Sequence, residues 1–128
     1  MMSNIELVEK VYEAFLSGNL AAWAVLHTAD FEYKTPGNFP HSGTFVGPQV
    51  VIDQSFSLMA ETLSNLEISP IKFFECGDTV LVHLLMTADN LKSETMHMFT
   101  VREGYISKFQ GFDDTAAISQ AALKNGGH

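Results

Sequence analysis

Four runs of β-forming residues fill the second half of this chain, and short turns separate them. The runs cover residues 66–74, 79–87, 94–101 and 105–112. Strands joined by turns this short pair as antiparallel neighbours, because a parallel connection needs a dozen or more residues. We therefore predict an antiparallel meander of four strands, with turns at 76–78, 88–92 and 102–104.

The first half of the chain carries helical periodicity instead. Ser3 followed by Glu6 is typical of a capping box, and Gly18 ends the helix that the box opens. The apolar residues of this helix recur on one face: Ile5, Val8, Tyr12 and Phe15. A second helix is expected over 20–27. A third is expected from Pro48, because proline has no N–H to lose at the first helical position.

A short strand and a loop separate the second helix from the third. Residues 31–33 alternate as a strand does, whereas residues 35–43 hold two prolines and two glycines, which favour a loop. A terminal helix is expected to begin at Asp114 and to end before Gly126. The order is helix, helix, strand, helix, four strands and helix, which indicates one α+β domain over residues 1–128.

The charge distribution argues against nucleic acid and against an anionic membrane as partners. The chain has a net charge of −8, and its 7 Lys and Arg residues form no basic stripe that could neutralise phosphates. Cys76 is the only cysteine, which fits a reducing compartment. The sequence shows no secretion signal and no apolar run long enough to span a bilayer. We expect a cytoplasmic protein.

The register of the meander predicts which residues share a face of the sheet. A turn centred near Leu91 and another near Glu103 place eight residues on the first face: His83, Leu85, Thr95, His97, Phe99, Phe109, Gly111 and Asp113. The second face would carry Val82, Leu84, Met86, Met96, Met98, Ile106 and Phe112. Because the second face is also apolar, we expect a homodimer built through it.

The first face mixes aromatic rings with polar side chains, which indicates a pocket. Polar groups cost free energy when they are buried without partners, and a bound ligand would supply partners. Taken singly, each histidine also fits a core residue bonded to backbone or water. A metal site on His83, His97 and Asp113 is a further alternative, although the sequence has no HxH or HExxH spacing. No glycine-rich phosphate loop is present, and we expect no cofactor.

Five segments together call for a comparison with a known family. They are residues 8–20, Thr35-Pro36-Gly37, 42–47, 97–106 and 112–116. In these segments the chain resembles the SnoaL-like and ketosteroid-isomerase-like proteins of the nuclear transport factor two-like superfamily. The resemblance implies a cystatin-like cone, in which a curved antiparallel sheet wraps on the N-terminal helices and encloses a pocket. It implies less about function, because this scaffold hosts isomerases, cyclases, hydrolases, dehydratases and plain binders.

The catalytic set of the ketosteroid isomerases is missing from the matching positions. That chemistry needs a tyrosine and a protonated aspartic acid to hold the enolate oxygen, and a carboxylate base. The resemblance puts Val11 at the tyrosine position, with Tyr12 one residue away on a different helix face. It puts Thr35 at the position of the base and His97 at that of the aspartic acid. Steroid isomerisation is therefore not expected.

The SnoaL-like cyclases are the better comparison. They resemble this chain in placing an acidic residue among polar groups in an apolar pocket. Two carboxylates are candidates for that role: Asp113, which strand alternation points inward, and Asp114, which stands at the family's Asp-Thr position. His97 could share the proton with Asp113 or with the substrate. Asp113 would face inward with a raised pKa, whereas Asp114 also fits a helix cap. The residues expected to contact a ligand are Tyr12, Trp23, Tyr33, Thr35, Phe45, His83, Thr95, Phe99, Phe109 and Gly111.

Two functions stay open at the level of the sequence. One is an enzyme that moves a proton on a small hydrophobic carbonyl compound, by isomerising, cyclising or hydrating a polyketide-, steroid- or terpenoid-like molecule. The other is a module that binds such a ligand without changing it, or that serves dimerisation.

Overall fold

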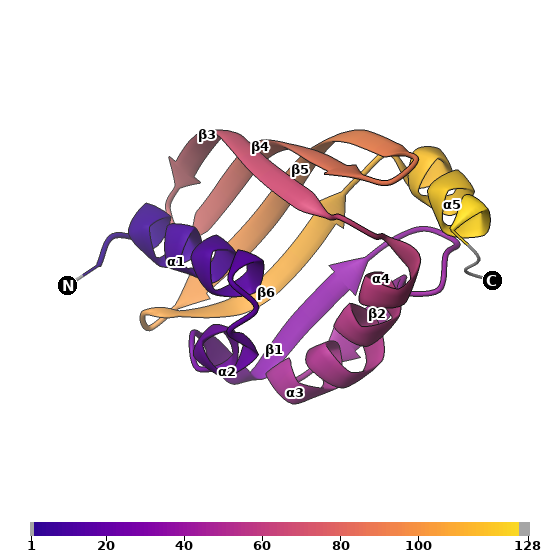
Figure 1. Ribbon diagram of the computed structural model, residues 1–128. Coiled ribbons are helices and arrows are strands. Elements are labelled where there is room, and N and C mark those ends of the chain that lie inside the picture. The colour runs from indigo at the N-terminus through magenta and orange to yellow at the C-terminus, as the bar shows by residue number, and fades with distance from the viewer. Residues whose placement is uncertain (1, 126–128) are drawn as a thin grey trace.

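The structure is a computed structural model that describes residues 2–125, and it sets helices along one side of a curved six-stranded sheet (Figure 1). The elements are α1 (Asn4–Leu16), α2 (Leu20–Ala24), β1 (His27–Thr35), β2 (Gly43–Val46), α3 (Pro48–Val50), η1 (Val51–Phe56), α4 (Ser57–Thr62), β3 (Glu67–Cys76), β4 (Thr79–Ala88), β5 (Leu91–Arg102), β6 (Tyr105–Phe112) and α5 (Thr115–Lys124). The predicted α+β class is confirmed.

Helix α1 forms where its capping box predicts it. The Glu6 backbone N–H donates to Ser3 Oγ at 3.1 Å, and the Ser3 N–H donates to Glu6 Oε1 at 3.0 Å. The buried residues of the helix are Leu7, Val8, Val11, Tyr12 and Ala14. Gly18 follows the helix at a φ of 75°, a left-handed conformation that costs glycine little. The apolar side of α1 is thereby fixed against the sheet.

Strands β3 to β6 form the predicted antiparallel meander within a sheet of order β2-β1-β6-β5-β4-β3. The first half of the chain adds two strands where the sequence predicted one. β1 is longer than expected and runs parallel to β6, and β2 pairs antiparallel with β1 across the loop of residues 36–42. Because β1 begins at His27, the second helix ends at Ala24, earlier than predicted.

The third helical segment is continuous but changes its winding. It begins with Pro48 at its first turn, as predicted, passes through the π-helical turn η1 and ends as α4. Figure 1 shows this segment on the same side of the sheet as α1 and α2. Helix α5 lies close to the end of α4, where Asn125 Nδ2 donates to the Thr62 carbonyl at 2.9 Å. Among the described residues, no helix is long and apolar enough to cross a membrane.

The turn between β4 and β5 differs from the predicted turn. It consists of Asp89 and Asn90 alone, closed by the pair Ala88–Leu91, and Asn90 adopts a φ of 64°. Asparagine tolerates this left-handed conformation better than most residues. The predicted centre at Leu91 lies farther along the chain, so each residue of β4 pairs with a residue of β5 that is an odd number of positions away from the predicted one. An odd shift exchanges the two faces of the preceding strand.

The face assignment of β4 is therefore wrong, while that of β5 holds. In the observed register Val82 pairs with His97 and Leu84 with Thr95, so these four side chains share the inner face. The residues of β4 predicted to lie outside are fully or almost fully buried: Val82, Leu84 and Met86. His83 and Leu85, predicted to lie inside, alternate with them on the outer face.

The turn between β5 and β6 lies close to its predicted place. Glu103 and Gly104 both have positive φ, as a two-residue hairpin turn requires. His97 pairs with Gly111 and Phe99 with Phe109, which keeps these residues on the predicted inner face. Ile106, predicted to lie outside, is fully buried. The pairing of β5 with β6 shifts register between Thr100 and Val101. The inward–outward alternation that holds at Phe109 and Gly111 therefore does not continue to Ile106.

Candidate functional site

A cavity lies between the helices and the inner face of the sheet. The volume open to the centre of a water-sized sphere is about 70 Å³. Because one water needs roughly 10–15 Å³ in this measure, the cavity has room for about five waters, or for a ligand of one ring rather than four fused rings. The aromatic residues of its wall are Tyr12, Phe15, Trp23, Phe31, Tyr33, Phe56, Phe99 and Phe109.

The aromatic wall is braced by ring contacts among its members. Tyr33 stacks on Phe109 with centroids 4.8 Å apart and planes 9° apart, and Trp23 meets the edge of Phe56 at 4.8 Å. These contacts join β1 to β6 and α2 to the π-helical turn. The cavity is thus a gap in a fixed framework of rings.

Three imidazoles and one carboxyl group interrupt this apolar wall: His27, His41, His97 and Asp113. Thr35 adds a hydroxyl, and no Lys or Arg of residues 2–125 lines the cavity. Polar groups this few and this deeply placed are typical of a site that orients a mostly apolar ligand.

Asp113 follows β6 directly and is half-buried at the cavity wall, where the sequence predicted it. Its Oδ1 is buried and has no hydrogen-bond partner among the described residues. Burial raises the pKa of this carboxyl to about 6, although the nearby Thr95 hydroxyl acts to lower it. At neutral pH the group is therefore mostly an ionised carboxylate with one free acceptor.

Gly111 makes room for that carboxylate. A Cβ atom at Gly111 would lie 2.8 Å from Asp113 Oδ2 and 3.8 Å from His97 Cδ2. Asp113 and His97 are therefore neighbours across a position that has no side chain. Gly111 was predicted to contact a ligand. In the structure Gly111 contacts Asp113 and His97 but does not itself line the cavity.

Substituting Gly111→Ala should displace the carboxylate. The backbone at Gly111 has no left-handed φ, so alanine is sterically allowed except for the crowded Oδ2. We expect the pKa of Asp113 to move from about 6 and the free energy of unfolding to fall by about 1–3 kcal/mol. Carbon-detected NMR titration of the Asp113 carboxyl measures the first and urea unfolding the second. An unchanged pKa would show that Gly111 does not shape the site.

His97 is the second polar group of the site, and it is held by α1. Its Nδ1 lies 2.8 Å from the Tyr12 hydroxyl in a buried hydrogen bond. Burial lowers the pKa of His97 to about 3, and burial together with the charge of Asp113 raises the pKa of Tyr12. Both groups are thus neutral at physiological pH.

The Tyr12–His97 pair offers one free donor whichever way its hydrogen bond runs. If Tyr12 donates to Nδ1, the imidazole carries its proton on Nε2. If Nδ1 donates, the tyrosine keeps its own O–H proton. Tyr12 lines the cavity, where a ligand contact was predicted for it. The buried stripe of α1 is wide enough for its neighbour Val11 to line the cavity as well.

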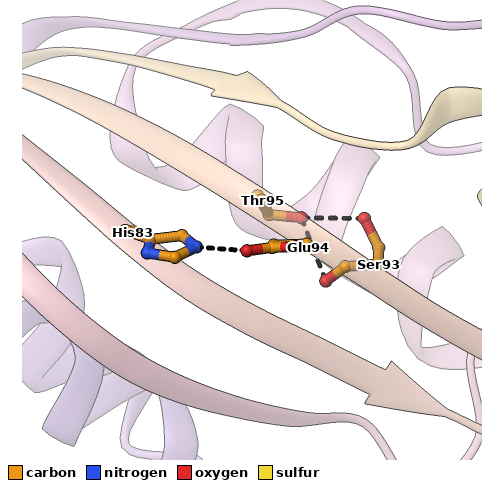
Figure 2. Close-up of polar contacts among 4 residues, drawn as sticks. All are labelled: His83, Ser93, Glu94 and Thr95. Atoms are coloured by element: carbon orange, nitrogen blue, oxygen red, sulfur yellow. Dashed lines mark hydrogen bonds and ion pairs between the residues drawn. The ribbon is translucent and has the colours of Figure 1, made fainter.

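His83 lies outside the site, contrary to prediction. Figure 2 shows its ring beside Glu94, with Nε2 2.7 Å from Glu94 Oε1 on the outer face of the sheet. The cause is the register of β4, which turns His83 away from His97. The alternative of a metal site on His83, His97 and Asp113 fails for the same reason, because the three side chains do not share a face.

Thr95 is buried on the inner face but supports the site from behind. Its Oγ1 lies 2.8 Å from Ser93 Oγ, as Figure 2 shows, and Ser93 Oγ accepts a hydrogen bond from the Asp114 N–H at 3.1 Å. These bonds tie β5 to the residue after Asp113. Thr95 does not line the cavity, so its predicted ligand contact is replaced by a bond within the protein.

Asp114 and Phe45 also lie away from the cavity. Asp114 Oδ1 accepts from the Ala117 N–H at 3.1 Å, which is the cap of α5 that the sequence offered as its alternative role. Phe45 packs against the core on β2, with its ring 6.3 Å from Tyr33. The remaining predicted contacts do line the cavity: Tyr12, Trp23, Tyr33, Thr35, Phe99 and Phe109.

His27 and His41 line the cavity but were not predicted. His27 Nδ1 donates to the Trp23 carbonyl at 2.8 Å, and burial lowers its pKa to about 4. His41 sits in the loop between β1 and β2 with a pKa of about 4 for the same reason. Neither position belongs to a periodic pattern. For His41 the available signal was its place in a segment rich in proline and glycine, and for His27 it was only its place at the end of a predicted helix.

The comparisons with known proteins are consistent with this architecture. A family model described as a SnoaL-like domain matches residues 8–109. Since this match covers most of the chain, the protein belongs to the SnoaL-like domain family, which confirms the resemblance seen in the sequence. A search of curated proteins finds no match.

Solved structures share the fold at low sequence identity. A protein with a cystatin-like fold from Xanthomonas campestris has a TM-score of 0.81 at 22% identity, over 95% of this chain and 98% of that chain. TerC, co-crystallised with polyporic acid, has a TM-score of 0.82 at 22% identity, over 94% and 98%. A protein with a ketosteroid isomerase-like fold from Catenulispora acidiphila, in complex with trimethylamine, has a TM-score of 0.75 at 15% identity, over 92% of both chains.

Proposed function

We propose that this protein binds a small, mostly apolar carbonyl compound in the cavity and transfers a proton on it. The observation that carries the proposal is the Asp113 carboxylate, whose buried Oδ1 has no hydrogen-bond partner among the described residues, on a mostly apolar wall. An unpaired buried acceptor costs about 1–3 kcal/mol, and a purely structural role would leave that cost without compensation. A base that must receive a proton needs such a free oxygen.

The neighbouring groups fit the other half of the reaction. Asp113 takes the proton from a carbon next to the carbonyl, and the electrons of the C–H bond move to the carbonyl oxygen as an enolate. The free donor of the Tyr12–His97 pair stabilises that oxygen by hydrogen bonding. When a double bond is conjugated with the enolate, return of the proton from Asp113 to the far carbon of that bond completes an isomerisation. When the enolate carbon attacks a second carbonyl of the same molecule, the alkoxide that forms takes the proton from Asp113 and completes a cyclisation. A pKa of about 6 suits Asp113 to this task at neutral pH.

Two structural neighbours support the binding of small molecules by this fold. TerC was crystallised with polyporic acid, and the Catenulispora acidiphila protein with trimethylamine. The volume of the cavity favours ligands closer in size to one ring than to a steroid skeleton.

The single tryptophan provides the test of binding, because Trp23 lines the cavity. Acetophenone, a ketone with one ring, should quench the fluorescence of Trp23 and saturate as the cavity fills. Free N-acetyltryptophanamide is the control and should be quenched linearly, by collision alone. Linear quenching of the protein as well would show that the cavity takes no such guest. Binding without any turnover, measured as in the Discussion, would favour the non-catalytic module instead.

We also propose that the protein forms a homodimer through the outer face of its meander. The apolar residues of this face are Phe74, Leu81, Leu85, Met96, Met98 and Phe112. Phe74 and Phe112 are 40% and 48% exposed in the single chain, and a second copy would cover them.

Replacing Met98→Arg should dissociate this dimer, because it places a charge in the middle of the apolar face. Sedimentation velocity at micromolar concentration should show the wild-type chain as a dimer and the variant as a folded monomer. Val46→Arg on β2, which is exposed and distant in the strand order, is the matched control and should remain dimeric. A wild-type monomer would refute the proposal.

A further inference from the structure

One histidine of the cavity has a polar atom with no partner and no part in the proton transfer described above. His41 is only 3% exposed, and its Nδ1 is buried without a hydrogen-bond partner among the described residues. His41 lines the same cavity as Asp113. A buried imidazole nitrogen left unpaired is costly, so a group that completes its hydrogen bond is expected to enter the cavity.

The loop around His41 holds the ring in place. The Ser55 hydroxyl donates to the His41 carbonyl at 2.9 Å, and the His41 ring packs on Phe39 with centroids 4.5 Å apart. Ser42 Oγ donates to the Phe39 carbonyl at 2.7 Å, which closes the turn between these residues. These contacts hold the backbone of the loop and pack the ring on Phe39, and in this position Nδ1 has no partner among the described residues.

A hydroxyl group can form a hydrogen bond with this nitrogen in either neutral tautomer of the His41 ring. If the His41 proton is on Nε2, Nδ1 accepts a hydrogen bond, and a carbonyl oxygen could not provide one. If the proton is on Nδ1, that nitrogen donates, and an ammonium group could not receive it. A hydroxyl both donates and accepts, so it satisfies both cases.

His27 strengthens the demand for donors on the ligand. Its Nδ1 lies 2.8 Å from the Trp23 carbonyl, which can only accept, so the proton must be on Nδ1 and Nε2 is an acceptor. Asp113 is an acceptor as well when ionised. A ligand with a lone carbonyl would pair with the Tyr12–His97 donor and leave these acceptors without partners.

The wall also opposes a negative charge on the ligand. No Lys or Arg lines the cavity within the part of the chain that the structure describes, and the net charge of the whole chain is −8. Burial lowers the pKa values of His27, His41 and His97, so these histidines are uncharged at neutral pH. A carboxylate or phosphate would meet the Asp113 carboxylate with no cation to offset the repulsion.

We infer that the cavity recognises a neutral carbonyl compound that also carries a hydroxyl group, and that His41 is the residue that binds the hydroxyl. This inference rests on the proposed function, because it specifies the ligand of the same cavity. It assigns His41 a role in specificity, separate from the proton transfer at Asp113.

Three ligands of one ring size separate the possibilities: acetophenone, 4-hydroxyacetophenone and 4-acetylbenzoate. Their affinities are measured by quenching of Trp23 at pH 7.5. We expect the hydroxyl to improve the dissociation constant by about tenfold over acetophenone, since it completes a buried hydrogen bond. We expect the carboxylate to bind at least about tenfold more weakly than acetophenone.

Variants of His41 assign the effect to this residue. His41→Phe keeps a ring on Phe39 but has no nitrogen, so within this variant the hydroxyl should no longer improve binding, and the affinities for 4-hydroxyacetophenone and acetophenone should become about equal. His41→Asn carries polar atoms close to the position of Nδ1 and should recover part of that gain. His83→Phe is the matched control on the outer face, and it should keep the full gain.

The outcomes distinguish this inference from the proposed function. If acetophenone itself does not saturate, the proposed function fails and the inference with it. If acetophenone saturates but the hydroxyl adds nothing, or if His41→Phe keeps the gain, the inference alone is wrong. Tight binding of 4-acetylbenzoate would likewise overturn the requirement for a neutral ligand.

Discussion

Asp113→Asn should lower the rate of proton abstraction in the cavity by about 10²- to 10⁴-fold. The general substrate for a buried carboxylate base is 5-nitrobenzisoxazole, a compact, largely apolar molecule. A base removes the proton on C3 of the isoxazole ring, the electrons of that C–H bond form the nitrile as the N–O bond breaks, and a coloured phenolate is released. Asparagine has nearly the shape of aspartate but accepts no proton, so the loss reports the base alone.

The pH dependence of the same reaction identifies the base further. Asp113 acts only when ionised, so kcat/KM should rise with pH through about 6 and level off above it. Asp114→Asn is the matched control, because Asp114 caps α5 and asparagine caps a helix equally well. If the two asparagine variants lost activity equally, or if Asp113→Asn kept the wild-type rate, Asp113 would not be the base.

The same substitution should stabilise the fold at neutral pH. The pKa of Asp113 is raised from an ordinary value of 3.8 to about 6, so the folded protein favours the neutral acid and holds its proton longer than the unfolded chain. The stability that the buried neutral carboxyl provides is fully present at pH values below 3.8, the pKa in the unfolded chain. It is lost as the pH rises through about 6, the pKa in the folded protein. The shift of about two units corresponds to about 3 kcal/mol.

Asp113→Asn removes this pH-dependent loss, because asparagine does not ionise. The difference in unfolding free energy between variant and wild type should increase by about 3 kcal/mol between pH 3 and pH 7. That corresponds to a rise in Tm on the order of 10 °C at pH 7. Urea titrations at several pH values measure it. A difference independent of pH would mean that Asp113 is solvated like an ordinary surface carboxylate.

Asp113 thus shows a conflict between activity and stability that a structural residue would not. Removing it should cost the reaction and strengthen the fold. Functional sites commonly hold such unfavourable groups, because a reactive carboxylate needs a free oxygen and a dry surrounding.

The order of the helices and the meander could be predicted because each rests on local chemistry. The capping box of Ser3 and Glu6 and the turn of Glu103 and Gly104 are visible in a few neighbouring residues. The second of these turns fixed the register of β5 and β6 closely enough to place His97 and Asp113 on one side. The inward–outward alternation of side chains along β5 and β6 then predicted which of their residues face the helices.

The face of β4 and two histidines of the cavity could not be predicted for a different reason. The sequence around Asp89 and Asn90 is compatible with several turn centres. An error of an odd number of residues in the register exchanges the inner and outer faces of β4. His27 and His41 reach the cavity through the parallel pairing of β1 with β6 and through a loop. Contacts of that kind join distant parts of the chain and leave no periodic trace.

The most direct test of the account is the pKa of Asp113 in the presence and absence of a guest. Carbon-detected NMR of the wild-type carboxyl should give a pKa of about 6 for the free protein. Saturation with acetophenone, which has no donor to stabilise the carboxylate, should raise that pKa further by excluding water. A pKa near 4 that acetophenone leaves unchanged would contradict the claim that Asp113 faces a cavity filled by an apolar ligand.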